Sequence, residues 1–198
     1  MSNCNALLEI QVHLEDGRIS RFEQNDPALV RTLLAHIQPT KLFAQPHIVL
    51  RDDKAMTLFP CTTIVRIDLI APNVPEWPFY RGVKNVQEIT REEFQKLSAP
   101  KKDPRSPLVY AGDSETDYAE IETVSGQLIY LQLEVRREPV TAIDRHMLLQ
   151  QLLALGGLHW RRHDGGTSIL NTAKIARLAM SPGPSAPAGA WPASRLLG

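Results

Sequence analysis

The residues of this 198-residue chain that point most directly to chemistry are four cations beside two expected hairpin turns. Arg51 and Lys54 lie at the first turn, and Arg161 and Arg162 lie just before the second. Guanidinium and ammonium groups at strand tips can bind phosphate or carboxylate groups. If both turns face one groove, the four residues form a site for an anionic ligand. The favoured alternative is charge that keeps strand edges from aggregating.

Three aromatic residues, Trp77, Phe79 and Tyr80, lie close together in the proline-rich stretch VPEWPFYRG. Aromatic side chains in such a loop either anchor it to the core or offer a surface to a partner. Anchoring is the simpler interpretation. We nevertheless keep the three residues as candidates for partner binding.

Histidine and acidic residues do not form a convincing metal site. His159 and His163 are four residues apart, a spacing that brings two rings together on a helix, but the nearby Gly-Gly turn indicates a strand instead. An acidic run lacks the pattern of a calcium-binding loop and resembles a solvated charge run; it comprises Asp113, Glu115, Asp117, Glu120 and Glu122. We predict no metal.

Catalytic motifs are equally lacking in the sequence. The chain contains neither the G-x-S-x-G turn of a nucleophilic serine nor a glycine-rich phosphate loop. We therefore predict no cofactor and favour a protein that is not an enzyme. An enzyme whose site is assembled only in three dimensions stays open.

Composition limits the classes of partner and the compartment. Lys and Arg total 22, as do Asp and Glu, so no overall field draws the chain to nucleic acid or to anionic membrane. The start of the chain lacks the basic region of a signal peptide, and no apolar stretch is long enough to span a membrane. We predict a cytoplasmic protein whose two cysteines, Cys4 and Cys61, are free thiols; a disulfide between them is the alternative.

The pattern of apolar residues predicts a first unit of mixed α and β structure. Apolar and polar residues alternate over 7–14, Asp16-Gly17 marks a hairpin turn, and Asp26-Pro27 begins a helix that runs to Ile37. Further strands are expected at 47–50, 56–59 and 62–70.

A second stretch resembles the first. Thr57–Leu69 aligns without a gap on Ser168–Met180, and LEIQ at 8–11 aligns on AEIE at 119–122. A helix is expected over 141–155 between two hairpins. We therefore predict an α+β fold of two pseudo-repeated ββαββ units, whose antiparallel sheets meet face to face or edge to edge.

The expected boundaries follow from proline and glycine content. Residues 1–70 form the first unit, 71–117 a proline-rich connector, 118–180 the second unit and 181–198 a disordered tail. Within the connector, Thr90 and Glu93 have the spacing of a capping box and predict one short helix over 90–97.

The hairpins end in the pattern F-x-x-x-x-I-x-R-I, carried here by Phe59, Ile64, Arg66 and Ile67. This pattern resembles small sheet modules such as LytTR-type DNA-binding domains and Sm-like barrels. The resemblance implies a compact antiparallel sheet in each unit, and we transfer no functional residue from it.

Taken together, these features favour a non-enzymatic cytoplasmic module that binds or assembles through protein–protein contacts, self-association included. The alternative is weak binding of nucleic acid or nucleotide through the hairpin-turn arginines. A third possibility is an enzyme with a site between the two units. We expect no membrane association.

Overall fold

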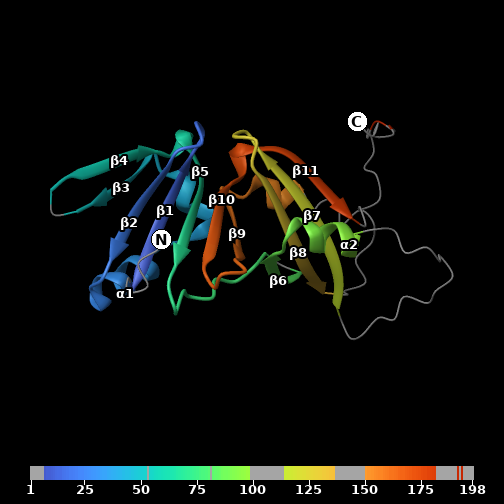
Figure 1. The fold of residues 1–198 in the computed structure, drawn as a ribbon, viewed down its shortest axis with the longest axis horizontal. Coiled ribbons are helices and arrows are strands. Elements are labelled where there is room, and N and C mark those ends of the chain that lie inside the picture. The colour runs from blue at the N-terminus through green and yellow to red at the C-terminus, as the bar shows by residue number, and fades with distance from the viewer. Residues whose placement is uncertain are drawn as a thin grey trace.

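The computed structural model describes residues 7–52, 54–80, 82–98, 114–136 and 150–181, together with residues 191 and 193. Its main feature is a nine-stranded, mostly antiparallel sheet, accompanied by a separate two-stranded hairpin and a few short helices (Figure 1). The predicted α+β class with antiparallel sheets is confirmed at this level. Apart from residues 191 and 193, the expected tail after residue 181 lies outside the described residues, as do Cys4 and most of the expected helix over 141–155.

The elements of the first part follow the expected order. They are β1 (Leu8–Leu14), β2 (Ile19–Gln24), α1 (Pro27–His36), the 3-10 helix η1 (Pro39–Ala44), β3 (His47–Arg51), β4 (Met56–Pro60), the 3-10 helix η2 (Cys61–Thr63) and β5 (Ile64–Ile70). Strands β3 and β4 pair only with each other, whereas β1 lies between β2 and β5.

The remaining elements build the other part of the sheet. They are β6 (Val83–Glu88), α2 (Arg91–Ser98), β7 (Ser114–Thr123), β8 (Leu128–Arg136), β9 (Gly157–Arg161), β10 (Thr167–Asn171), the 3-10 helix η3 (Thr172–Lys174) and β11 (Ile175–Ser181). Residues 150–154 are also helical. Here β7 lies between β8 and β11, and β9 pairs with β10.

Both named helices begin with the caps that the sequence predicts. The Asp26 carboxylate accepts hydrogen bonds from the backbone N–H groups of Ala28 and Leu29. Thr90 and Glu93 cap α2 reciprocally, since each side chain bonds the other residue's backbone N–H. These side chains satisfy amide groups that the first turn of a helix leaves without partners.

Strand β6 was not expected, because the connector was predicted to hold only a short helix. The strand pairs antiparallel with β8 and touches β9 in parallel at Gln87 and Arg161. The sequence of this strand, VKNVQE, has little apolar alternation, and only Val86 is buried. Neighbouring strands, rather than local propensity, define this element.

The sheet has the order β11-β7-β8-β6-β9-β10-β5-β1-β2. Strands β10 and β5 pair antiparallel and thereby join the first part to the second, edge to edge. The outer strands are β2 at one end and β11 at the other.

The sheet separates two hydrophobic cores. Successive side chains of β10 point to opposite faces, so Ile169 lies in the first core and Leu170 in the second. Strand β5 has Ile67 in the first core and Val65 in the second, because the irregularity in its pairing with β1 leaves Val65 unpaired between Ile64 and Arg66 and interrupts the alternation there. The two joining strands are therefore packed on both faces, and β5 is buried along nearly its whole length.

A close backbone contact also ties the two parts together. Gly157, at the start of β9, lies so near η1 that an added Cβ would overlap the carbonyl oxygen of Pro39. Only glycine lets the two backbones approach in this way.

We expect Gly157→Ala to destabilise the protein more than Gly17→Ala. At Gly157 the new methyl group would push two backbones apart, at a cost of about 1–3 kcal/mol or more. Gly17 has a φ of 84° with open space around it, so alanine there costs only about 1–2 kcal/mol of backbone strain. Urea unfolding of both variants measures the difference; equal costs would show that η1 moves freely away from β9.

Candidate functional site

The most concentrated group of polar side chains lies where β5 meets β10. Asp68 is fully buried, and its carboxylate contacts His13 Nε2 at 2.8 Å, Arg66 Nη2 at 3.0 Å and the Ser168 hydroxyl, which donates at 2.7 Å. Arg162 Nη1 also donates to this carboxylate. Side chains from β1, β5, β10 and the turn after β9 thus meet on one acidic group.

Electrostatics keep Asp68 ionised. Burial alone would raise its pKa, but the hydrogen bond from His13 and the charges of Arg66 and Arg162 outweigh burial and lower the pKa to about 2. Arg162 is held in turn by a hydrogen bond to Asp164, which raises the pKa of the guanidinium and lowers that of the Asp164 carboxyl.

The arrangement around Asp68 fits a structural junction rather than a catalytic site. A nucleophilic serine needs a base that takes its proton. Here the hydroxyl of Ser168 donates to the same carboxylate that His13 contacts, so the acid stands between the two groups. Among the described residues, no group of three His, Cys, Asp or Glu side chains is arranged to hold a metal ion.

The structure does not bring the four predicted cations together. Arg51 and Lys54 belong to the β3–β4 hairpin at one end of the molecule, whereas Arg161 ends β9 and Arg162 follows it, near the middle of the molecule (Figure 1). Arg161 forms an ion pair with Glu76. Arg162 is bound to Asp68 and Asp164. Within the described residues, Arg51 and Lys54 form no ion pair.

Phe79 and Tyr80 of the connector pack on the second part of the sheet, whereas Trp77 packs against the first core and also meets the ring of His159. Phe79 stacks on the ring of His159 with 4.8 Å between ring centroids, and Trp77 meets the same ring edge-on at 6.1 Å. The Tyr80 hydroxyl donates to the side chain of Gln151. These contacts anchor the connector and so position β6, which follows it, beside β8.

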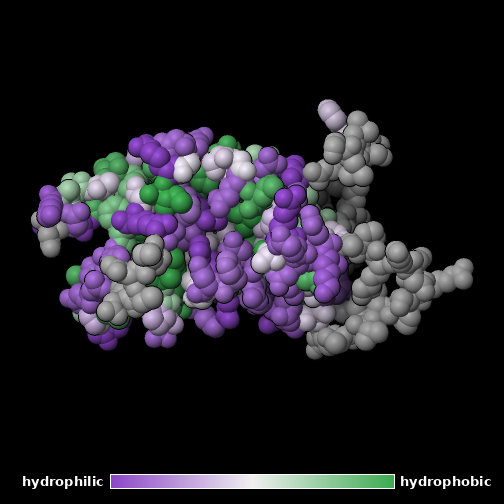
Figure 2. All heavy atoms as spheres, viewed as in Figure 1, coloured by the Kyte–Doolittle hydropathy of each residue, from purple (hydrophilic) through white to green (hydrophobic). Residues whose placement is uncertain are grey.

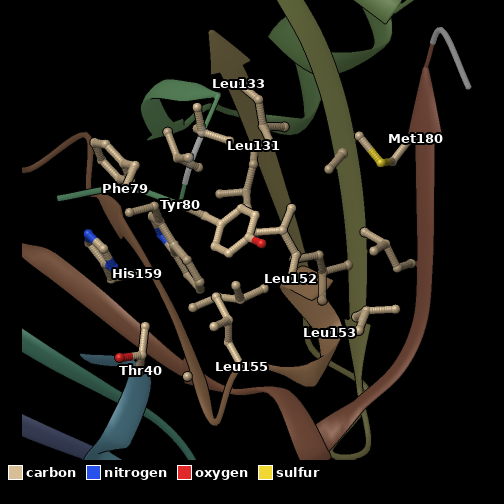
Figure 3. A pocket seen from close by; sticks show the side chains of 18 of the residues that line it. Thr40, Phe79, Tyr80, Leu131, Leu133, Leu152, Leu153, Leu155, His159 and Met180 are labelled. Carbon is tan, nitrogen blue, oxygen red and sulfur yellow. The ribbon is translucent and has the colours of Figure 1, made fainter. Parts of the chain in front are cut away.

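An apolar cavity of about 300 Å³ is lined in part by Phe79 and Tyr80 (Figure 3). Leu131 and Leu133 of β8, Met180 of β11 and Leu152 face it, and the ring of Tyr80 projects into it. Burial lowers the pKa of nearby His159, although its hydrogen bond to the Trp77 carbonyl opposes that shift. The lining residues that the structure describes include no Asp, Glu, Lys or Arg.

A wider hollow lies in the first part, between β1, β3, β5 and α1. Its volume is about 710 Å³, and its walls include Val12, Ile48, Leu50 and Leu69. No strand among the described residues stands between β2 and β3 in the way that β6 stands between β8 and β9.

The β3–β4 hairpin exposes large apolar side chains to solvent. Met56 is 70% exposed, Leu58 51% and Val49 43%. Figure 2 shows hydrophobic residues among polar ones at this end of the molecule. Among the described residues, strand β4 pairs only with β3, so its other side is an open edge with apolar side chains. We call this surface the β4 edge.

Comparison with known protein families, with curated proteins and with solved structures found no match for this chain. Within the described residues, no helix is long and apolar enough to cross a membrane. Cys61 is a free, buried thiol whose pKa is raised by burial, which makes it unreactive.

Sequence reasoning did not identify Asp68 or the β4 edge. A usable signal for Asp68 was present in IVRIDLI, where Arg66 and Asp68 interrupt an otherwise apolar strand two residues apart. Charges in such a strand are buried only when they are paired. For the β4 edge there was no such signal, because the sequence alone does not distinguish exposed apolar residues such as Met56 and Leu58 from buried ones.

We expect Asp68→Asn to destabilise the protein by about 3–5 kcal/mol, because it leaves Arg66 buried without its counter-charge. Asp16→Asn, which changes an exposed acid paired with Arg18, is the matched control and should stay close to wild type. Urea unfolding at neutral pH compares the two. A small effect at Asp68 would show that water replaces the lost carboxylate.

The same carboxyl makes stability depend on pH. Its pKa is lower in the folded protein, about 2, than the ordinary 3.8, so its contribution is present above pH 4 and is lost as pH falls from 4 toward 2. The loss amounts to about 2 kcal/mol. Unfolding measured across this range should show a shallower pH dependence in Asp68→Asn than in wild type; parallel curves would contradict the assignment.

Proposed function

We propose that this protein is a non-enzymatic assembly module that binds protein through an open strand edge. The observation that carries the proposal is the β4 edge, where Leu58 and Met56 are exposed beside strand backbone that pairs with no further strand in the described part of the chain. Exposed apolar edges invite pairing with another chain, and soluble proteins ordinarily protect them. An edge that is both apolar and open serves binding by strand addition.

Comparison of the two parts of the sheet supports this proposal. We infer that residues 8–70 and 114–181 are copies of one unit, with β1, β2, β3, β4 and β5 corresponding to β7, β8, β9, β10 and β11. In the first copy Ile10 lies opposite Leu69, and in the second Ala119 lies opposite Met180. Both ladders carry an irregularity at the same end, and a three-residue 3-10 helix precedes β5 and β11 alike.

This correspondence also relates the two hollows. Corresponding residues line the two hollows. In each pair the first residue lines the hollow of the first part and the second lines the cavity of the second part: Ile10 and Ala119, Val12 and Ile121, Ile67 and Leu178, and Leu69 and Met180. The correspondence differs from the sequence alignment at the first strand. The alignment matches Leu8 with Ala119, whereas the strand pairing matches Ile10 with Ala119, two residues further along. Alternating strands align equally well after such a shift, because side chains repeat every two residues.

The two copies differ in what covers their hairpins. Strand β10 pairs with β5 along the edge that does not face β9, and its Ile169 is completely buried. Leu58, the corresponding residue of β4, is 51% exposed. The unit thus has a surface that is covered in one copy and open in the other, as a binding surface awaiting a partner would be.

We expect Leu58→Lys to remove the bound partner. Full burial of a leucine is favourable by about 1.5–3 kcal/mol, so a buried lysine should weaken binding at least about tenfold. The tagged full-length chain would be recovered from cells that make it, and the bound proteins quantified. Ile19→Lys, on β2 and 46% exposed, is the matched control. A bound set that is unchanged by Leu58→Lys would contradict the proposal.

The alternative, binding of nucleic acid, has less support. Arg162 and Arg161 are engaged with carboxylates, which leaves Arg51 and Lys54 at the hairpin. Two phosphate contacts give a slope of about −1.8 in log affinity against log salt. We expect fluorescence anisotropy with mixed-sequence DNA and RNA to show no binding tighter than about micromolar at physiological salt. Nanomolar binding lost in Arg51→Ala would favour the alternative.

A further inference from the structure

We propose that the partner of the β4 edge is a second copy of this chain, and that β4 of one copy pairs antiparallel with β11 of the next. This inference rests on the proposed function and names its partner. Its starting point is a joint that exists within each chain, between β10 and β5.

The internal joint defines the geometry. Strand β10 pairs with β9 on one side and with β5 on the other, while β5 pairs with β10 and β1. The corresponding strands are β4, which pairs only with β3, and β11, which pairs only with β7 among the described residues. Each chain therefore presents, unpaired, both halves of a joint that it also forms internally.

The register of the external joint follows from the internal one. Within the chain Ile169 lies opposite Ile67, and Thr167 opposite Leu69. The corresponding pairs between two chains are Leu58 with Leu178, and Met56 with Met180. Both are apolar pairs, which stabilise neighbouring strands.

Burial at the internal joint shows what the external one would cover. Ile169 and Ile67 are 0% and 5% exposed, respectively. Their counterparts Leu58 and Leu178 are exposed and half-buried. Pairing would give both leucines the environment that the internal isoleucines already have.

Charge favours the same register. Inside the chain Arg162 reaches across to Asp68 on β5. Arg51, which aligns with Arg162, has no counter-charge among the described residues. The β11 side offers Glu120, a carboxylate on β7 directly opposite Ala179, and this group is bound at present by Arg177. Arg51 of one copy would therefore approach an acidic strand of the next.

The external joint lacks two features of the internal one. Asp68 corresponds to Ala179, so no buried carboxylate gathers the strands. Asn171, whose side-chain amide donates to the carbonyls of Cys61 and Ile64, corresponds to Pro60. Contacts between chains are therefore weaker than those within a chain, and association is reversible and depends on concentration.

The joint is head-to-tail, because it uses different surfaces on its two sides. Strands β4 and β11 lie toward opposite ends of the molecule (Figure 1). A pair of chains keeps one unpaired β4 and one unpaired β11. Such assemblies grow beyond a dimer until they close into a ring or form a filament.

Sedimentation velocity of the full-length chain over a range of concentrations tests the assembly. We expect the wild-type chain to form species larger than a dimer. Leu58→Lys should need a concentration at least about tenfold higher to form the same species. Ile19→Lys is the matched control, since Ile19 is 46% exposed on β2, the other outer strand of the sheet. It should assemble as wild type does. A wild-type chain that is monomeric at all concentrations overturns the inference.

Cysteine cross-linking tests the register. In a Cys4→Ser background, the double variant Leu58→Cys with Leu178→Cys should yield a ladder of covalent multimers on oxidation. Val49→Cys with Leu178→Cys is the control, because β3 lies on the far side of β4 from the proposed joint. A ladder in the control and none in the test pair overturns the inference. So does equal cross-linking in both.

These results are distinguishable from failure of the proposed function. A monomeric chain that still loses a different bound protein in Leu58→Lys retains the function and loses the self-association. A monomeric chain whose bound proteins ignore the substitution loses both.

Discussion

The pairing of β5 with β10, secured by the buried carboxylate of Asp68, is the contact on which the architecture depends. It turns two small sheets into one and separates two cores, because both strands pack on each face. A buried carboxylate is tolerated only when charges and donors surround it. Here His13, Arg66, Arg162 and Ser168 come from both parts of the chain, so the carboxylate is satisfied only when the parts have joined.

Much of the first part could be predicted from the sequence, because local signals there are strong. Asp26 and Pro27 begin α1 as the cap chemistry requires, and alternation locates β1 and β5. Strand β6 could not be predicted, because it is ordered by its neighbours on both sides. The joint between β5 and β10 was also hidden: edge-to-edge and face-to-face packing require the same apolar residues, and pairing partners one hundred residues apart leave no local pattern.

The candidate site was harder to predict for the same reason. Arginines near turns suggested an anionic ligand, but three-dimensional pairing decides what an arginine does. Arg162 holds the central carboxylate and Arg161 an exposed acid, while Arg51, at the distant hairpin, has no ion pair with any described residue. The aromatic residues show the converse, since Trp77 and Phe79 use their surfaces internally on His159. Neither outcome is encoded in residue type or spacing.

If the two parts are copies of one unit, their differences matter more than their likeness. The internal joint needs strength, and it has a buried charge network and the Asn171 amide to supply it. The open surfaces replace these groups with Ala179 and Pro60 while keeping apolar residues at Leu58 and Leu178. Apolar contact without a buried charge network gives attraction without a large cost on separation, since no buried charge is left unpaired when chains part. A joint of that kind suits reversible assembly, whereas the Asp68 joint suits a permanent fold.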